Sequence, residues 1–371
     1  MITTVDYHTG GEPFRIVTGG VPGIPGADVL TRRENAPAHA DHVRRLLCHE
    51  PRGHADMYGC FLVPPDDAGA HLGALFWHKD GFSTACGHGT IALGAYAVQE
   101  GLVEADPDGE TDVVVDVPSG RVRARVRCSG GRVAGVTFVS VPSFVIARDV
   151  AVAGTKVDIS YGGAIYASIS AGVLGLSVEP RHLTALVGHA RRIKAALAGH
   201  PATRHPRDDR LSGVYGVIFY DDLPDDDLPD DDLPDDDLPD SGSADGGLAD
   251  SGLTGVGLPG EGLSGGGSVG GGSPGAGRSV RQRNVTVFAD GEVDRSPCGS
   301  GTAARMALLH DAGLRGTLVH ESVVGSVFRA RVAGATAEGI VPEIEGMAYR
   351  TGRHVFELDP DDPIGTGFTL R

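Results

Sequence analysis

Lysine, cysteine and long apolar runs are all scarce in this chain of 371 residues. The only lysines are Lys79, Lys156 and Lys194, and none has the surroundings of a lysine that binds pyridoxal phosphate. No run of about 18 apolar residues occurs, so a membrane span is not expected. The first residues, MITTVDYHTGGEP, lack the basic start and apolar core of a signal peptide, which favours a cytoplasmic protein.

The five cysteines do not form the pattern of a metal site. They are Cys48, Cys60, Cys86, Cys128 and Cys298, with no CxxC pair and no Cys/His cluster at zinc spacing. We therefore expect no metal, and thiols rather than disulfides in a reducing compartment. Cys48, Cys60 and Cys128 are interpreted as inert buried side chains.

An acidic repeat accounts for most of the net charge of −17. Residues 221–240 read DDLPDDDLPDDDLPDDDLPD, and setting aside their 12 aspartates leaves a net charge of −5. Neither part has the basic surface that nucleic acid requires. A Gly/Ser tract follows, so we expect a disordered insert over 221–277. Passive growth of a tolerant loop is favoured over an acidic interaction tail.

One cysteine-bearing motif occurs twice, 212 residues apart. Thr84–Leu102 reads TACGHGTIALGAYAVQEGL and Ser296–Leu314 reads SPCGSGTAARMALLHDAGL. Both contain Cys-Gly-x-Gly-Thr, an alanine-rich helical run and Gly-Leu at the same distance. A duplicated motif is far more specific than a single one, and it indicates an internal repeat.

A weaker repeat supports two similar domains. Val5–Val17 and Val157–Ile169 both read Val-Asp-x-x-x-Gly-Gly, and the two halves come into nearly equal register once the insert is removed. We expect an α+β fold with domains at 1–147 and 148–371, the C-terminal segment returning to the first. Helical patterns occur at Ala40–Leu47, Thr90–Gln99, Pro180–Ala198 and Thr302–Ala312.

Each motif suits a thiol beside an anion site. Glycines after Cys86 and Cys298 permit a tight turn, and the helix that follows presents unpaired N–H groups at its positive end. The same field is expected to lower the pKa of each cysteine. If the two motifs face each other, one thiol removes an α-proton and the other returns a proton to the opposite face. That arrangement inverts an amino acid without a cofactor.

The chain resembles the proline racemase family along nearly its whole length outside the insert. The resemblance is carried by HTGGEP, EPRGHADMYG, GFSTACGHGTIAL, VDISYGGAIYA, VFADGEVDRSPCGSGTAARMALL and HESVVGSVF. It implies the diaminopimelate-epimerase-like fold, two similar domains facing across a cleft. It also implies an imino acid as the small-molecule substrate, and a homodimer is a family-level expectation.

By this resemblance, Cys86 and Cys298 occupy the two catalytic positions. The ligand-binding positions fall on Gly87, His88, Asp294, Gly299 and Ser300. Backbone amides at 87–88 and 299–300 are expected to hold the substrate carboxylate. His88 and Asp294 are expected to address the ring nitrogen.

The catalytic pair and the surrounding sequence favour different reactions. The background resembles trans-3-hydroxy-L-proline dehydratases, which usually carry threonine where this chain has Cys298, whereas racemases and epimerases carry two cysteines. Because a thiol at the second position can reprotonate the substrate, racemisation or 2-epimerisation of proline or hydroxyproline is our first hypothesis. Dehydration of trans-3-hydroxy-L-proline is the second, and a non-catalytic binding protein or an isomerase of the diaminopimelate type follows.

Overall fold

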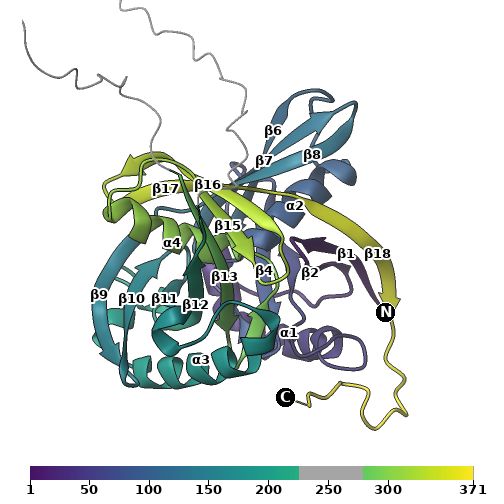
Figure 1. Ribbon diagram of the computed structural model, residues 1–371. Helices are drawn as coiled ribbons and strands as arrows, with labels where there is room; N and C mark the ends of the chain where they lie inside the picture. The colour runs from purple at the N-terminus through teal and green to yellow at the C-terminus, as the bar shows by residue number, and fades with distance from the viewer. Residues whose placement is uncertain (225–278, 371) are drawn as a thin grey trace, which may run out of the picture. The chain divides into compact units, whose positions relative to one another are not determined.

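A computed structural model describes residues 1–224 and 279–370 (Figure 1). The elements of the first run are β1 (Ile2–Thr9), β2 (Glu12–Gly19), α1 (Val29–Cys48), β3 (Gly59–Val63), β4 (Leu72–His78), β5 (Gly81–Phe82), α2 (Gly87–Gln99), β6 (Glu110–Val117), β7 (Gly120–Ser129), β8 (Arg132–Val139) and β9 (Phe144–Val152). Those of the second run are β10 (Thr155–Tyr161), β11 (Ile165–Ser170), α3 (Leu183–Leu197), β12 (Val214–Asp222), β13 (Val280–Phe288), β14 (Glu292–Asp294), α4 (Gly299–Asp311), β15 (Leu318–Ser322), β16 (Val327–Thr336), β17 (Gly339–Gly346) and β18 (Ala348–Phe356). Short 3₁₀ helices lie at Ala171–Leu174, Pro180–His182, Pro201–Thr203 and Asp209–Leu211.

Strands β1–β9 and strands β10–β18 repeat the same pairing pattern. β1 pairs antiparallel with β2 and β2 pairs parallel with β3, just as β10 pairs with β11 and β11 with β12. Further along, β4 pairs parallel with β6 and β13 pairs parallel with β15. The internal repeat expected from the two cysteine motifs is therefore present in the sheet topology.

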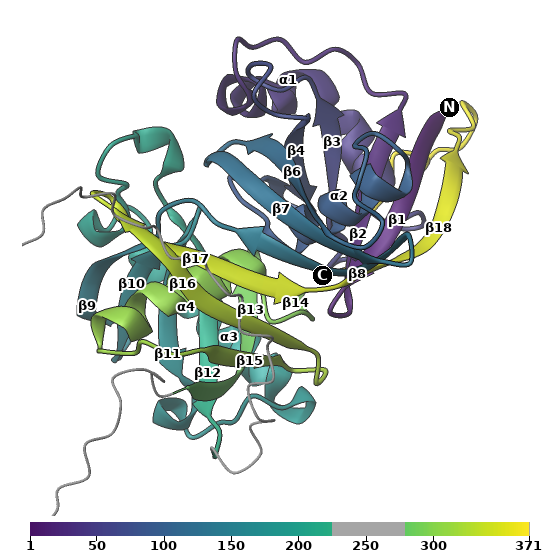
Figure 2. The same cartoon turned by 90° about the horizontal axis from the view of Figure 1, so that it is seen from above.

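The last strand of each series pairs with the first strand of the other series. β9 pairs with β10, and β18 pairs with β1. We call β1–β8 with β18 the first half, and β9–β17 the second half. The halves are joined by antiparallel pairing of β8 with β17, so hydrogen-bonded strands continue from one half into the other (Figure 2).

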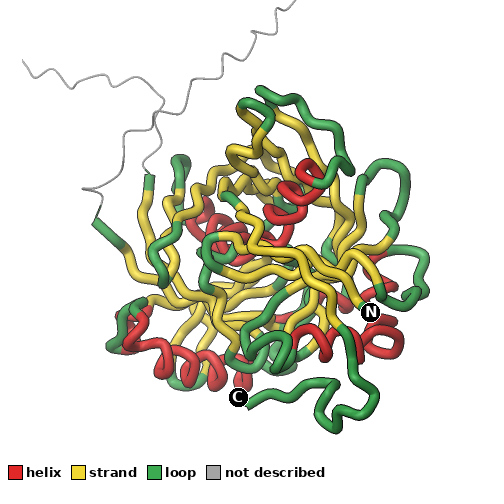
Figure 3. The backbone as a smooth tube through the Cα atoms, turned by 90° about the vertical axis from the view of Figure 1, so that its right-hand side faces the viewer, coloured by secondary structure: helices red, strands yellow, loops and turns green. Residues whose placement is uncertain are grey.

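Each half wraps its strands around one helix. α2 contacts β7 and β8, and α4 contacts β10 and β17. Alanine and glycine dominate both helices, and α2 is buried from Gly87 to Ala97, as expected of a helix surrounded by sheet. α1 and α3 instead pack outside, against β4 and β12 respectively, and strands make up most of the body between them (Figure 3).

The expected start of the insert differs from the structure. Asp221 and Asp222, assigned to the disordered insert, belong to β12 and pair with Arg283 and Gln282 of β13. Strand pairing and a hydrogen bond from the Val178 N–H to Asp221 order these two aspartates. The rest of the insert, from residue 225, lies outside the described residues. Residues 147 and 148, between which the domain division is expected, both lie in β9, beside a register shift in the pairing of β9 with β10.

None of the helices within residues 1–224 and 279–370 has the length and apolar character needed to cross a membrane.

Candidate active site

Cys86 stands at the start of α2 as its N-cap residue. Its Sγ accepts a hydrogen bond from the Gly89 N–H at 3.2 Å, so the thiol takes the place of a capping hydroxyl. The Thr90 hydroxyl donates to the Cys86 carbonyl at 2.8 Å. The Cys-Gly-x-Gly-Thr pattern thus fixes the thiol at the positive end of a buried helix.

Cys298 stands at the equivalent start of α4, but on a different backbone. Its φ is +63°, in the left-handed region that non-glycine residues rarely adopt. The Thr302 N–H donates to the Cys298 carbonyl at 2.6 Å, and the Thr302 hydroxyl donates to the Pro297 carbonyl at 3.0 Å. The turn holds the second thiol in a conformation that must be maintained by its surroundings.

The two helix starts abut each other. A Cβ atom built on Gly87 would lie 2.5 Å from the Gly299 Cα, and one built on Gly299 would lie 2.6 Å from the Gly87 Cα. Only glycine at both positions allows this approach. The first-turn N–H groups at 87–88 and 299–300, which fall before the intrahelical ladder begins, are therefore gathered in one place.

Both thiols line a single cavity between the halves. Its volume is about 10 Å³, roughly the space of one water. Its walls are Tyr58, Ala85, Cys86, His88, Tyr166, Tyr215, Phe288, Asp294, Cys298 and Ser300. The structure thus gathers the predicted Cys86, His88, Asp294, Cys298 and Ser300 in one site, with Gly87 and Gly299 directly behind it.

His88 and Asp294 face each other across this cavity. His88 Nδ1 lies 3.7 Å from Asp294 Oδ2, and both side chains are buried. Asp294 Oδ1 accepts hydrogen bonds from the backbone N–H and the hydroxyl of Ser296, which leaves Oδ2 turned toward the histidine. Burial lowers the pKa of His88 more than the charge of Asp294 raises it, so the imidazole is neutral at pH 7.

The Tyr166 hydroxyl contacts both Ser300 and the second thiol. The Tyr166 hydroxyl lies 2.7 Å from Ser300 Oγ and 3.9 Å from Cys298 Sγ. Tyr58 and Tyr215 hydroxyls lie 3.0 Å apart, and Tyr58 also contacts Ser83 Oγ at 2.5 Å. Burial raises the pKa of all three tyrosines, so their hydroxyls stay protonated at neutral pH.

The expectation that the helix field lowers the pKa of the two cysteines is wrong as a net direction. Burial raises the pKa of Cys86 well above its usual range, and the Gly89 hydrogen bond opposes this only in part. Burial also raises the pKa of Cys298, and the charge of Asp294 adds to it. Loss of water around a thiolate therefore outweighs the helix dipole.

The sequence analysis gave no role to five wall residues. Tyr58, Ala85, Tyr166 and Phe288 lie inside motifs that carried the resemblance. Tyr215, in β12, lies outside those motifs. The position of a residue in a strand indicates the face of the sheet on which its side chain lies, but it does not say that this face meets the other half.

The larger hollows of the described chain contain none of the predicted site residues. One of about 770 Å³ lies along β9–β11 and includes Asp149, Lys156 and Tyr220. Its size does not make it the reactive site, because neither of the two cysteines of the duplicated motif lies in its walls.

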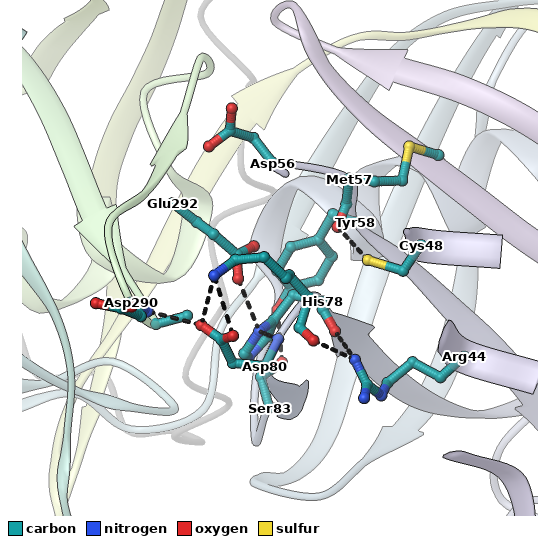
Figure 4. A network of polar contacts seen from close by, with 12 residues as sticks. Arg44, Cys48, Asp56, Met57, Tyr58, His78, Asp80, Ser83, Asp290 and Glu292 are labelled. Atoms are coloured by element: carbon teal, nitrogen blue, oxygen red, sulfur yellow. Dashed lines mark hydrogen bonds and ion pairs between the residues drawn. The ribbon is translucent and has the colours of Figure 1, made fainter. Parts of the chain in front are cut away.

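One group of side chains has the composition of a metal site. His78, Asp80 and Glu292 offer ligand atoms within 4.8 Å of one another. The Lys79 ammonium lies 3.1 Å from Asp80 Oδ1, and the Asp80 N–H lies 3.2 Å from His78 Nδ1 (Figure 4). Because a lysine cation and a backbone donor already engage two of the three ligands, we interpret the group as an internal ion network.

The proline racemase family model matches residues 4–231 and 272–369. The chain belongs to the proline racemase family. This family is the one that the cysteine motifs resemble. A solved hydroxyproline epimerase from Agrobacterium vitis, with bound trans-4-hydroxy-L-proline, is 28% identical and superimposes with a TM-score of 0.80 over 100% of this chain and 94% of its own. The expected fold of two similar domains facing across a cleft is confirmed.

Relatives in the proline racemase family carry two kinds of name. A Bacillus cereus protein named trans-3-hydroxy-L-proline dehydratase is 37% identical over 379 residues, covering 99% of this chain and 98% of its own length. A Burkholderia multivorans protein named 3-hydroxyproline 2-epimerase is 37% identical over 382 residues, covering 100% of this chain and 98% of its own length. This chain is therefore similar to enzymes that epimerise and to enzymes that dehydrate hydroxyproline.

Proposed function

We propose that this proline racemase family member is a cofactor-independent 2-epimerase of an imino acid, with Cys86 and Cys298 as its two catalytic residues. The observation that carries the proposal is that both thiols line one cavity, each from the start of its own buried helix. Inversion needs a base on one face of the α-carbon and a proton donor on the other. The duplicated motif supplies one thiol from each half.

The substrate carboxylate is assigned to the abutting helix starts. Backbone N–H groups of Gly87, His88, Gly299 and Ser300 lie in first turns, where they are free of the helical ladder. Two positive helix ends that meet attract an anion. Because the cavity holds only about 10 Å³, its walls must move apart to admit an imino acid.

The two thiols share one proton in the reactive state. The negative charge of a Cys298 thiolate raises the pKa of Cys86, so ionisation of both is unfavourable. One thiolate therefore removes the α-proton while the opposite thiol donates its own. The sulfur that abstracts the proton in one direction is the donor in the other.

His88 and Asp294 are assigned to the ring nitrogen. Asp294 Oδ2 and the neutral imidazole of His88 are a polar pair in the wall of the cavity that both thiols line. A carboxylate beside a protonated ring nitrogen stabilises the zwitterion, and its charge balances the cation in a site where water is excluded. The positive nitrogen in turn favours the thiolate whose formation burial opposes.

We expect the opened site to bind a hydroxylated ring better than proline. Three protonated hydroxyls, from Tyr58, Tyr166 and Tyr215, belong to its walls. A site with buried hydrogen-bonding groups discriminates strongly against an analogue that lacks their partner. Since one relative is named 3-hydroxyproline 2-epimerase, 3-hydroxyproline is the first substrate to test.

Dehydration of trans-3-hydroxy-L-proline is the second candidate, and the name of the 37% identical Bacillus cereus relative favours it. Removal of the same α-proton starts both reactions. Dehydration then expels the 3-hydroxyl, whereas epimerisation returns a proton to the α-carbon. A thiol at 298 favours the second course because it is a competent acid on the opposite face.

The experiment offers reduced protein L-proline, trans-4-hydroxy-L-proline and trans-3-hydroxy-L-proline separately. Chiral chromatography and proton NMR follow the products. We expect the C2-inverted isomer of a hydroxyproline and slower or no inversion of proline. Formation of pyrroline-2-carboxylate from the 3-hydroxy compound, without the inverted isomer, would contradict the proposal and establish the dehydratase.

A further inference from the structure

Strand β14 of the second half has one edge paired with a strand and the other held by carboxylates of the first half. On one side it pairs antiparallel with β13. On the other, the Val293 N–H donates to Asp56 Oδ1 at 3.2 Å and the Arg295 N–H donates to Glu12 Oε2 at 2.8 Å. An edge strand must satisfy its outward N–H groups, and here side chains replace a neighbouring strand.

A third carboxylate holds the turn that precedes β14. The Asp290 N–H donates to Asp80 Oδ2 at 2.8 Å, and His78 Nδ1 lies 3.4 Å from Glu292 Oε1. Figure 4 shows Asp80 reaching the backbone of Asp290 from the opposite half. Asp56 lies near the same segment, so successive positions of one short stretch are all held from the first half.

The Arg295 side chain ties two of these carboxylates together. Its Nη2 donates to Asp56 Oδ2 at 2.9 Å and its Nη1 donates to the Asp56 carbonyl at 3.2 Å. Nη1 also lies 3.6 Å from Glu12 Oε2. We call Glu12, Asp56 and Asp80, with the 290–295 segment that they hold, the carboxylate clasp.

The clasp leads directly into the second thiol. Asp294 Oδ1 accepts from the Ser296 N–H and hydroxyl at 2.8 and 2.7 Å, and Ser296 Oγ accepts from the Cys298 N–H at 3.0 Å. Only Ser296 and Pro297 therefore separate Arg295 from a cysteine whose φ is +63°. A strained residue persists only where its surroundings over-determine it, and the clasp provides that constraint.

Stability alone does not account for the clasp. Glu12 is 0% exposed and Asp56 is 2% exposed, so both carboxylates have lost their water. Well-packed apolar side chains commonly stabilise a protein as much as a buried ion pair does. Hydrogen bonds between charged groups have directional geometry, which apolar contacts lack.

We propose that Glu12, Asp56 and Asp80 are positioning residues that fix the Cys298 loop against the first half, and with it the placement of the second thiol relative to the first. This inference rests on the proposed function for its catalytic consequence, but its structural part does not. The segments HTGGEP, RGHADMYG and DRSPCG are distant in the sequence, and the proposal gives all three the same role of fixing the Cys298 loop.

The structural part is tested by the alkylation rate of each cysteine with iodoacetamide, measured by peptide mass spectrometry. Asp56→Ala and Asp80→Ala release the segment at two points, and Asp56→Asn retains an acceptor for the Val293 N–H. Asp66→Ala is the matched control, because Asp66 Oδ1 accepts the Val29 N–H at 2.7 Å within the first half. Circular dichroism confirms that each variant is folded.

We expect Cys298 to react at least about tenfold faster in Asp56→Ala, the factor that one lost hydrogen bond to a charged group gives a local opening equilibrium. The alkylation rate of Cys298 also rises in Asp80→Ala. In Asp56→Asn it lies between the rates of the wild type and Asp56→Ala, and in Asp66→Ala it equals that of the wild type. Cys86 gains less, because Gly89 holds it within the first half. Unchanged Cys298 labelling in folded Asp56→Ala and Asp80→Ala, or equal gains at both thiols, would overturn the proposal.

The catalytic consequence is tested on the substrate found active. Asp56→Ala is expected to lower kcat for inversion by about 100-fold with KM nearly unchanged, as misplacement by about 1 Å does. A rise in KM at constant kcat would contradict positioning. If the wild type inverts no imino acid, the proposed function fails, while the labelling result still decides the clasp.

Discussion

Cys86 and Cys298 occupy equivalent places in the repeat, yet their backbones differ. Cys86 has an extended φ of −155°, whereas Cys298 has a φ of +63°. The turn around Cys298 is held from outside by Ser296 and the clasp, while that around Cys86 is held by its own helix. Contacts within the first half therefore place Cys86, whereas the segment that leads to Cys298 is also held by carboxylates of the first half.

Replacing Cys298 with serine separates the two proton transfers. A serine hydroxyl is a poor acid, so inversion is expected to fall by at least about 100-fold, the usual contribution of a positioned acid or base. Exchange of the α-proton with solvent continues for the one epimer whose proton Cys86 removes. NMR in D2O with each epimer measures this, and Cys128→Ser, a buried cysteine of β7, is the matched control. Equal loss of exchange from both epimers would contradict the division of labour.

The residues of the site were predictable to the extent that they stand in the duplicated motif. Cys86, Cys298 and their neighbouring glycines follow from the repeat, and His88 and Asp294 from the resemblance. Tyr215 was not predictable, because strand alternation gives a face but not what that face meets. The raised pKa of the thiols was also missed, since burial depends on both halves together.

The site depends on the close approach between the starts of α2 and α4. Gly299→Ala would place a methyl 2.6 Å from the Gly87 Cα and force the helix starts apart. We expect inversion to fall by about 100-fold through misplacement and stability to fall by about 1–3 kcal/mol through overpacking. Urea denaturation and steady-state kinetics measure both.

Gly188→Ala is the control for that substitution. Gly188 lies within α3, and a Cβ there meets nothing within 4 Å. Alanine should stabilise the helix by about 0.5–1 kcal/mol and leave activity unchanged. If Gly299→Ala behaved like Gly188→Ala, the close approach of the two helix starts would have no role.

The helices were predictable in number but not in their starts. α1 was expected over Ala40–Leu47 but runs from Val29, because Asp28 caps it by accepting the Thr31 N–H and Pro37 is tolerated inside it. The N-terminal part of α1 is polar and contains a proline, so it shows no helical period of apolar residues. α2 and α4 were expected to begin at Thr90 and Thr302, and both begin three residues earlier, directly after the cysteines.

At the scale of the whole molecule, the matched spacing of motifs predicted two similar halves, and a return of the C-terminal segment to the first domain was expected. The crossing of β9 was not predicted, because the hydrophobic pattern of a strand does not name its partner. The domain division at 147/148, cytoplasmic location and homodimer stay predictions.

Folding stability should depend on pH through His320. This histidine is fully buried, its Nδ1 contacts Thr302 Oγ1 at 2.8 Å, and burial lowers its pKa to about 3. A lowered pKa contributes stability that is present above about pH 6.5 and lost as the pH falls toward 3. Between pH 7 and 5, the free energy of unfolding of the wild type should fall by about 2 kcal/mol more than that of His320→Gln. Parallel pH curves in urea denaturation would contradict this.

The most direct test of the central claim is the position of solvent deuterium early in the reaction. The wild-type enzyme is given one epimer of its substrate in D2O, and both epimers are analysed by chiral separation and mass spectrometry at low conversion. Two thiols on opposite faces predict that the product carries deuterium at the α-carbon while the remaining substrate is unlabelled. Product that retains the original proton, or substrate labelled as fast as product, would mean that one base serves both faces and would contradict the account.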